Sequence, residues 1–446
     1  MATSHPVETS ATKDIMIIGG SCAGLMAGIL LKRQGHRVQI LEQAVSSERE
    51  GLAAGIGLSG AVETFFDEND RLAGVPMSVD PGALRFLHPK ALAVTRRVVY
   101  PARMTTWDAC YYRLRANFDG LRRSYCLEPL DGDADAGESV FETGKRVTGV
   151  ALVNETVSIT AEDVKNGGTH IYEADAVIMA DGANSRMREQ LQPLVKRESP
   201  GYVLWRGTVP TSTLSQECLN RLEGDPVLYA MKHSYAVIYT IPGENGSLQP
   251  GERAINFGWY DWTRGPQHLH DILTDTDGHA HRSTLPKGKM RAEIWKAQLR
   301  TVDERMHPLI AELAHRITHP FVSVVSSIGA QRAVYFDERL FFVGDALVQI
   351  QPNMGGGMSK AANDVLLLAK VFDGELTAAE WEQGVLRYGE DARLKSRAFA
   401  AWWLCTWWGF IASFLRLRLW LGKRAIWDRW SAWRTQEAPL VRAKRQ

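Results

Sequence analysis

The chain has 446 residues, more than one hydrophobic core usually supports, so two domains are expected. Hydrophobic residues make up 45% and charged residues 23%, which is typical of globular proteins and argues against long disordered regions. The formal net charge is +1, so no global electrostatic field favours nucleic acid as a partner.

The five cysteines are scattered along the chain and form no Cys-x-x-Cys pair. An odd number without that spacing predicts neither a disulfide framework nor a zinc site, and we expect no metal. Free cysteines favour a reducing compartment, which we take to be the cytoplasm.

The first motif is a glycine turn between a short apolar strand, residues 14–18, and a helix. Gly19 permits the tight turn, Ser21 stands where the second glycine of the dinucleotide fingerprint is usual, and Gly24 allows close packing of the helix on the strand. A pyrophosphate can then bind the free N–H groups at the helix start. Glu42 ends the next strand, at the distance where a carboxylate accepts hydrogen bonds from a ribose. This context predicts a bound dinucleotide; the alternative is a tight turn without a nucleotide.

Two later segments have the same order of strand, turn and helix. In the first, the apolar residues 176–180 lead into Asp181-Gly182. In the second, residues 340–343 lead into Gly344-Asp345, followed by Pro352, Gly355-Gly356-Gly357 and a helix that begins at Met358. Taken singly, each is also compatible with an ordinary turn or a helix cap.

Together the three segments resemble the class A flavoprotein monooxygenases, which share the p-hydroxybenzoate hydroxylase fold. Asp181, Gly182, Ser185 and Arg188 match the Asp-Gly-x-x-Ser-x-x-Arg motif of that family position by position. Residues 202–209, with a central Trp-Arg-Gly, and residues 357–364, with Gly-x-x-Lys-Ala-x-x-Asp, are similar to 2,6-dihydroxypyridine 3-hydroxylase-like members.

The resemblance implies FAD as cofactor and assigns roles to the motif residues. The Asp-Gly motif supports FAD and helps NAD(P)H to dock, and the Gly-Asp carboxylate binds the ribityl chain. The glycine-rich loop places a helix N-terminus beside the flavin pyrimidine, where the helix dipole stabilises the charge of the reduced ring. On this basis the expected cofactor-binding residues include Gly19, Gly24, Glu42, Asp181, Gly182, Arg188, Gly344, Asp345, Gly355, Gly356, Gly357 and Met358. Pro352 is expected at the catalytic face of the loop, and Asn353 replaces the histidine usual after that proline.

Three further segments hold weaker candidates for the FAD site. Arg103 stands at a strand end where the family places an Arg or Gln against FAD; otherwise it is a surface residue before a Thr-capped helix. Arg33, on the first helix, either reaches the adenosine or is a solvated charge. Gly55 and Gly57 either let the isoalloxazine approach the backbone or form a simple turn.

Because the motifs are spread along the chain, we expect a discontinuous, Rossmann-like α/β FAD-binding domain. It would comprise residues 1–80, 101–195 and 321–395, with an inserted, mainly antiparallel substrate domain of residues 81–100 and 200–320. Residues 226–241 and 253–262 partly alternate apolar and polar side chains, as strands do.

A substrate pocket between that sheet and the flavin would be apolar with few polar anchors. Its candidate lining residues are Tyr202, Trp205, Tyr235, Tyr239, Phe257 and Trp259, at least half of which we expect to be core aromatics. His233 and Tyr235 are the candidates for a general base that takes a phenol proton. A lone histidine is more often a structural or surface residue.

The C-terminal segment, residues 396–446, is predicted to be helical. Residues 398–415 carry no charge and include four tryptophans, with basic residues on both sides. Three interpretations remain open: a helix packed on the FAD domain or in a dimer, an interfacial helix that gives peripheral membrane contact, or a membrane span.

The implied function is FAD-dependent hydroxylation of an electron-rich aromatic compound with NADPH or NADH and O2, through a flavin C4a-hydroperoxide. An epoxidase or a Baeyer–Villiger-type enzyme, an oxygen-independent reductase or dehydrogenase, and a flavin-binding protein without turnover are the alternatives. Residue types alone do not separate these chemistries, because the cofactor supplies most of them.

Overall fold

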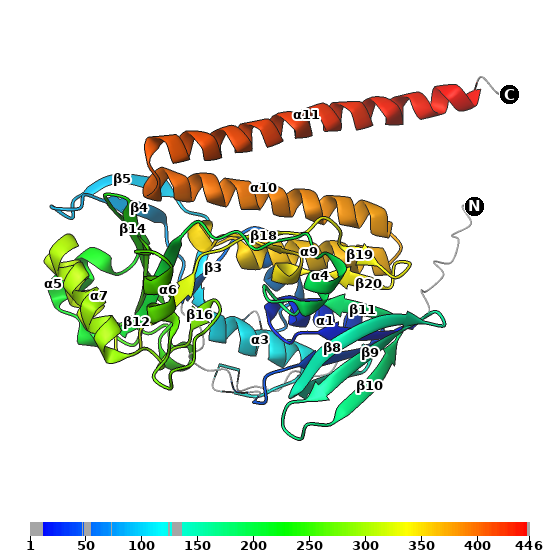
Figure 1. Cartoon of the computed structure of the whole chain (residues 1–446), viewed down its shortest axis with the longest axis horizontal. Coiled ribbons are helices and arrows are strands. Elements are labelled where there is room, and N and C mark those ends of the chain that lie inside the picture. The colour runs from blue at the N-terminus through cyan, green and yellow to red at the C-terminus, as the bar shows by residue number, and fades with distance from the viewer. Residues whose placement is uncertain are drawn as a thin grey trace.

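The computed structural model describes residues 12–46, 48, 55–72, 74–123, 125–126 and 136–443, with side chains as far as residue 425. Two large hydrophobic cores organise the chain. The first core surrounds a mostly parallel sheet and the second lies under a mainly antiparallel one, and the two sheets stand at opposite ends of the molecule (Figure 1).

The first sheet has six strands in the order β19-β20-β11-β1-β2-β7. All neighbours are parallel except the edge strand β19. The strands are β1 (Asp14–Ile18), β2 (Arg37–Glu42), β7 (Ser139–Thr143), β11 (Ala176–Met179), β19 (Val334–Tyr335) and β20 (Leu340–Phe342). The central strand β1 is almost entirely buried, as expected for a parallel sheet covered on both faces.

Helices and a small three-stranded sheet cover this parallel sheet. The helices are α1 (Cys22–Arg33), α2 (Ala61–Asn69), α3 (Trp107–Asp119), α4 (Arg186–Leu191) and α9 (Gly357–Phe372). Helix α1 packs between α3 and α9. An antiparallel meander of β8 (Lys145–Val153), β9 (Thr156–Asp163) and β10 (Thr169–Ala174) contacts strands of the sheet.

The second sheet has eight strands in the order β16-β17-β12-β15-β14-β13-β4-β5. They are β4 (Ala83–Leu87), β5 (Val94–Val99), β12 (Tyr202–Pro210), β13 (Val227–Met231), β14 (Ser234–Ile241), β15 (Ala254–Trp262), β16 (Thr284–Leu285) and β17 (Phe321–Val324). One face of this sheet packs against four helices, α5 (Gln216–Leu222), α6 (Pro266–Leu273), α7 (Ala292–Arg305) and α8 (Pro308–His315). Within the described residues, β13 and β4 form the only parallel pair of this sheet.

Short strand pairs and two long helices complete the fold. Strand β3 (Gly55–Leu58) pairs with β6 (Arg103–Thr106), and β18 (Ile328–Gly329) pairs with β21 (Val348–Gln349). Helix α10 (Ala378–Leu404) and helix α11 (Trp407–Ala443) form an antiparallel hairpin, in which α11 is the outermost element (Figure 1). Within the described part of the chain, no helix is both long and apolar enough to cross a bilayer.

The predicted fold class is confirmed: a parallel α/β domain, an inserted mainly antiparallel sheet and a helical C-terminal segment. Two boundaries differ from the expected ones. Strand β17, residues 321–324, pairs with β12 and so belongs to the second sheet. Helix α10 runs through residue 396 without a break, because its apolar side packs continuously from the first domain to the second.

Candidate active site

The glycine turn after β1 is shaped by contacts that only glycine tolerates. Gly19 has φ +106°, and a Cβ atom there would lie 2.4 Å from the Ala180 carbonyl oxygen. A Cβ at Gly24 would lie 2.0 Å from the Gly19 oxygen. The first motif therefore touches the second directly, at the residue before Asp181. Ser21 precedes α1 without capping it through its side chain, so the first-turn N–H groups remain available to an anion.

Glu42 lies at the same turn. Its buried carboxylate accepts hydrogen bonds from the backbone N–H of Gly20 at 2.9 Å and of Ala44 at 2.8 Å. These bonds tie the end of β2 to the glycine turn and place the carboxylate beside the start of α1. A ribose at the turn would lie within reach of this group.

Arg188 joins the second motif to the third. Its guanidinium donates to the carbonyl oxygens of Ala183 at 2.6 Å, Asp345 at 3.3 Å and Ala346 at 2.9 Å. Burial raises the pKa of Asp181 to about 6, against the opposing effects of Ser185 and Arg188. One Asp181 carboxylate oxygen is buried and has no hydrogen-bond partner among the described residues. Such an acceptor indicates a missing donor, as a ligand hydroxyl would supply.

Gly344 and Asp345 lie in a 3₁₀ turn that side chains of α9 bind through hydrogen bonds. Lys360 donates to the Gly344 carbonyl at 2.7 Å and to Asp364 at 2.6 Å, and Asp364 accepts the Gly344 N–H at 2.9 Å. Gly344 has φ +60°, and its Cβ would lie 2.8 Å from the Ala23 side chain on α1. The third motif therefore meets the first one.

The Asp345 side chain is exposed, although the surrounding protein raises the pKa of its carboxyl and Lys360 and Arg188 oppose that rise. The Asp345 carboxyl is therefore accessible to a ligand, while the protein around it limits its hydration. Gly19, Asp181 and Gly344 thus line one region, although they are separated by more than 150 residues in sequence.

The loop before α9 ends in an uncapped helix start. Gly355 has φ +69°, Gly356 precedes the helix, and no side chain caps Gly357 or the residues of the first turn. Met358 packs partly against the first core, and Pro352 is exposed at the opposite end of the loop. The positive end of the α9 dipole is therefore available to a ligand.

Asn353, the residue that departs from the family pattern, connects this loop to the second sheet. Its Nδ2 donates to the Tyr235 hydroxyl at 2.7 Å, and its Oδ1 accepts from Tyr202 at 3.3 Å. Tyr202 also donates to the Gln351 side chain at 3.0 Å. The amide thus fixes the loop by serving as donor and acceptor at once.

Two of the weaker candidates, Arg33 and Arg103, make their contacts with other residues of the protein. Arg33 is at the far end of α1, about 18 Å from the glycine turn by helix length, and donates to Asn69 at 2.7 Å. This position favours neither an adenosine contact nor a fully solvated charge. Arg103 contacts the carboxylates of Glu63 at 3.3 Å and Asp67 at 3.2 Å on α2, which already neutralise its charge.

Gly55 lies at the contact between the two sheets. Its carbonyl accepts from Arg206 and from Tyr239, each at 2.7 Å, and its N–H donates to Asn256 at 3.0 Å. A Cβ at Gly55 would lie 2.6 Å from the Tyr239 ring, so this position requires glycine for the domain contact.

The predicted aromatic lining divides into two sets because successive strand residues face opposite sides. Trp205, Phe257 and Trp259 belong to the core with α7 and α8. Tyr202, Tyr235 and Tyr239 lie on the other face, toward the parallel α/β domain. We call this side the tyrosine face, made up of Tyr202, Leu204, Arg206, Tyr235, Tyr239 and Tyr260.

Neither candidate general base is suited to that role. His233 is exposed in the two-residue turn between β13 and β14, with φ +57°, at a hairpin tip that turns its ring to solvent. Tyr235 is fully buried, stacked on Tyr260 at 4.6 Å between centroids and bonded to Asn353. Burial raises the pKa of Tyr235 well above its usual value, so the phenol stays neutral and structural.

Sequence reasoning missed Arg206 and Tyr260 as site residues. Arg206 is half-buried, and its charge opposes the rise that burial causes in the pKa values of Tyr239 and Tyr260. Gly258 lies between Arg206 and Val237 in the register, and the Leu204 side chain comes within 3.4 Å of where a Cβ of Gly258 would stand. The two-residue periodicity of a strand over residues 254–262 was the signal that could have placed Tyr260 on this side.

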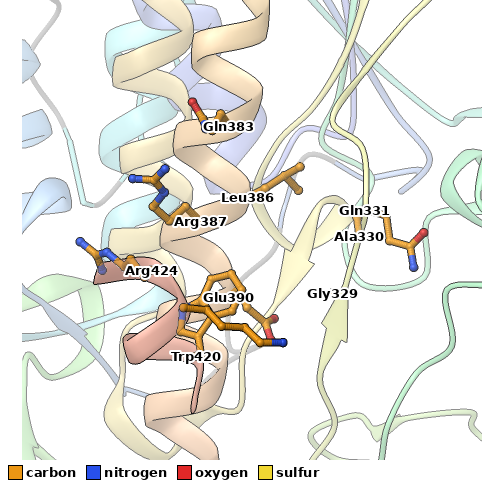
Figure 2. A pocket seen from close by; sticks show the side chains of 10 residues that line it. Gly329, Ala330, Gln331, Gln383, Leu386, Arg387, Glu390, Trp420 and Arg424 are labelled. Carbon is orange, nitrogen blue, oxygen red and sulfur yellow. The ribbon is translucent and has the colours of Figure 1, made fainter. Parts of the chain in front are cut away.

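A cavity of about 610 Å³ lies away from these motifs, between α10, α11 and β18 (Figure 2). Its lining includes Leu386 and Glu390 of α10, Trp420 of α11 and Gly329 of β18. None of the sequence-predicted site residues lines it.

The residues present at the motif region fit FAD. Direct contacts bring the three motif turns together, two helices start there without side-chain caps, and Asp181 keeps a buried acceptor without a partner. A dinucleotide needs this combination of close backbone approach, phosphate-binding N–H groups and ribose acceptors.

Comparisons with known proteins agree with this geometry. The family described as pyridine nucleotide-disulphide oxidoreductase matches residues 13–194, and the family described as FAD binding domain-like matches residues 200–327. The 2,6-dihydroxypyridine 3-monooxygenase of Paenarthrobacter nicotinovorans is 27% identical over 392 residues, or 85% of this chain and 88% of the relative. The 6-hydroxynicotinate 3-monooxygenase of Bordetella bronchiseptica is 25% identical over 85% of this chain and 87% of its own.

Solved structures show the same fold. The 2,6-dihydroxypyridine-3-hydroxylase from Arthrobacter nicotinovorans superposes with a TM-score of 0.76 at 23% identity, covering 89% of this chain and 93% of that one. A salicylate hydroxylase superposes with a TM-score of 0.64 at 17% identity over 94% and 95% of the two chains. The matched motifs, the fold and these relatives agree: the chain belongs to the family of FAD-dependent monooxygenases, and FAD is its cofactor.

Proposed function

We propose that this enzyme uses NAD(P)H and O2 to hydroxylate an electron-rich aromatic compound, a phenol or a hydroxypyridine. FAD, when bound, supplies the electron transfer and the oxygen chemistry, while the protein binds and orients the reactants. The named substrates of the relatives, dihydroxypyridine and hydroxynicotinate, are hydroxylated nitrogen heteroaromatics, which supports this class.

The observation that carries the proposal is the arrangement of Arg206 and Tyr239 on the tyrosine face. Both donate to the Gly55 carbonyl, so a cation and a neutral phenol stand where the sheet meets the FAD domain. Burial raises the pKa of Tyr239 to about 12, which keeps it a hydrogen-bond donor at neutral pH. In this proposal an aromatic ring bound beside Arg206 has its ionised ring oxygen near the guanidinium, and ionisation makes the ring electron-rich.

The same face is closed to water on one side. Phe399 and Trp403 of α10 pack against Tyr235, with centroid separations of 6.3 Å for each pair. Exclusion of water protects reactive species from hydrolysis and strengthens the electrostatic contacts of the substrate. In this proposal Arg206 and Tyr239 orient the ring, and Asp181, Arg188 and Asp345 hold the cofactor.

The test measures NADH and NADPH oxidation together with O2 uptake by the FAD-loaded enzyme against a panel of phenols and hydroxypyridines. Stimulation of both rates, with one ¹⁸O atom from ¹⁸O2 in the product, is expected. Oxidation of ketones or alkenes but not of phenols, or turnover without O2 uptake, contradicts the proposal.

Arg206→Met should raise KM for an ionisable phenol about tenfold to a hundredfold, since a hydrogen bond to a charged group is lost. Arg300→Met is the matched control, because Arg300 is exposed on α7, on the opposite side of the same sheet. An equal effect of the two changes contradicts the role of Arg206.

A further inference from the structure

The outward side of α11 carries a stripe of exposed apolar residues. Trp408 is 79% exposed, Leu415 54% and Leu419 66%. At about 100° per residue, positions seven and eleven apart return to within about 20° of the same direction, so the three side chains share one face. Trp402 and Trp407, at the turn of the α10–α11 hairpin, are also exposed. Monomeric soluble proteins rarely leave such a continuous apolar surface uncovered.

Basic residues border the stripe on both sides. Arg416 and Arg418 lie about 80° to either side of the Trp408 direction, and both are exposed, as is Lys423. The sequence from residue 392 to residue 425 contains no aspartate or glutamate. The surface that would cover this face must therefore be apolar at its centre and negative at its edges.

The opposite side of α11 is held against the body of the protein. Trp420 and Arg424 both bind the Asp391 carboxylate on α10. The cavity between α10 and α11 lies under this side, with Leu386 and Trp420 among its lining (Figure 2). Helix α11 lies along α10 (Figure 1). Its contacts with Asp391 face α10, and its exposed apolar stripe faces away from α10.

We propose that the α10–α11 hairpin binds the surface of an anionic lipid bilayer, with α11 lying in the plane of the interface. Tryptophan side chains favour the headgroup level of a bilayer, and arginines that flank an apolar helix face attract anionic headgroups. The absence of a spanning helix in the described part of the chain agrees with peripheral attachment.

A second copy of the chain fits this face poorly. Two α11 stripes in contact would bring Arg416 and Arg418 of one copy near the same residues of the other, and like charges repel. A bilayer with anionic headgroups complements both features of the face at once.

The experiment is co-sedimentation of the full-length, FAD-loaded enzyme with vesicles of phosphatidylcholine alone or with about a third phosphatidylglycerol. The enzyme should bind the anionic vesicles, and added salt should weaken the binding because headgroup attraction is screened. Trp408→Ser with Leu415→Ser should lower the affinity at least tenfold. Leu194→Ser, at a residue 84% exposed elsewhere, is the apolar control and should bind like the unchanged enzyme.

Arg416→Gln with Arg418→Gln tests the charge contribution. About tenfold weaker binding to the anionic vesicles is expected, with no change for Lys90→Gln, an exposed lysine of the second domain. The proposal is overturned if the enzyme does not bind anionic vesicles or if the Trp408/Leu415 change leaves binding intact. Sedimentation velocity that shows a dimer dissociated by the same change would instead assign the face to a second copy. FAD content and NAD(P)H oxidation, measured in parallel, report on the cofactor site independently.

Discussion

The buried Lys360–Asp364 pair allows a sharp test of how the FAD-binding turn is held. Both side chains are fully buried, and together they hold the N–H and the carbonyl of Gly344. Lys360→Met removes the cation and leaves the Asp364 carboxylate without its ion-pair partner. Breaking a buried pair in this way costs about 3–5 kcal/mol, far more than an exposed pair is worth.

The loss of stability caused by Lys360→Met should depend on pH, and the Asp364 carboxyl group determines whether that loss grows or shrinks as the pH rises. Burial already raises the pKa of Asp364 to about 6, and loss of the opposing Lys360 charge raises it further. The folded variant then retains a proton that the unfolded chain loses above about pH 4. Its stability therefore falls as the pH rises from about 4 to the new folded pKa, so the deficit is larger at pH 8 than at pH 5.

The assay is urea unfolding of the apoprotein at pH 5 and pH 8, with FAD retention after gel filtration measured by visible absorbance. Lys370→Met, at the exposed end of the same helix, is the control. Adding Asp364→Asn to Lys360→Met should recover part of the lost stability, because the uncompensated charge is gone. A loss of stability below about 1 kcal/mol at pH 8, or an equal loss for Lys370→Met, would show that the Lys360–Asp364 pair does not hold the turn.

Three other changes test separate parts of the site. Gly24→Ala should abolish FAD retention, because its Cβ would lie 2.0 Å from the Gly19 oxygen, whereas Gly168→Ala, with no atom within 4 Å, should retain FAD in the same gel-filtration assay. Asp181→Asn should increase stability relative to the unchanged protein above about pH 6, because burial raises the pKa of Asp181 and disfavours its ionised form. Urea unfolding should show a larger gain in stability at pH 8 than at pH 5, and an equal gain at both pH values contradicts the raised pKa of Asp181. Tyr235→Phe should reduce kcat less than tenfold and leave the pH profile unchanged, whereas loss of a general base costs about a hundredfold or more.

The local structure around the three motifs was predictable from short stretches of sequence. Gly19 and Gly24 allow a tight turn because they lack side chains, and the apolar run before each motif forms a buried strand. The order of strand, turn and helix around Asp181 and Gly344 follows from the same local signals. These features depend on backbone conformation within a few residues, which the residue types there largely determine.

Tertiary contacts decided which polar side chains meet around the motifs. Arg103 faces two carboxylates of α2, and Arg33 lies at the far end of its helix, although each was a candidate for an FAD contact. Tyr235 is not suited to act as a base, because its hydroxyl accepts a hydrogen bond from Asn353, which is more than 100 residues away in sequence. Such partners depend on how distant elements pack, and no short window of sequence records that.

Short stretches of the chain predicted the units of strand, turn and helix, and their resemblance to a known family implied FAD as the cofactor. The packing of distant elements placed Arg206 toward the FAD domain and Trp205 toward the opposite core, and it left the uncharged C-terminal stretch part buried and part exposed. Burial and charge pairing depend on contacts between residues far apart in sequence, so a local pattern does not contain them.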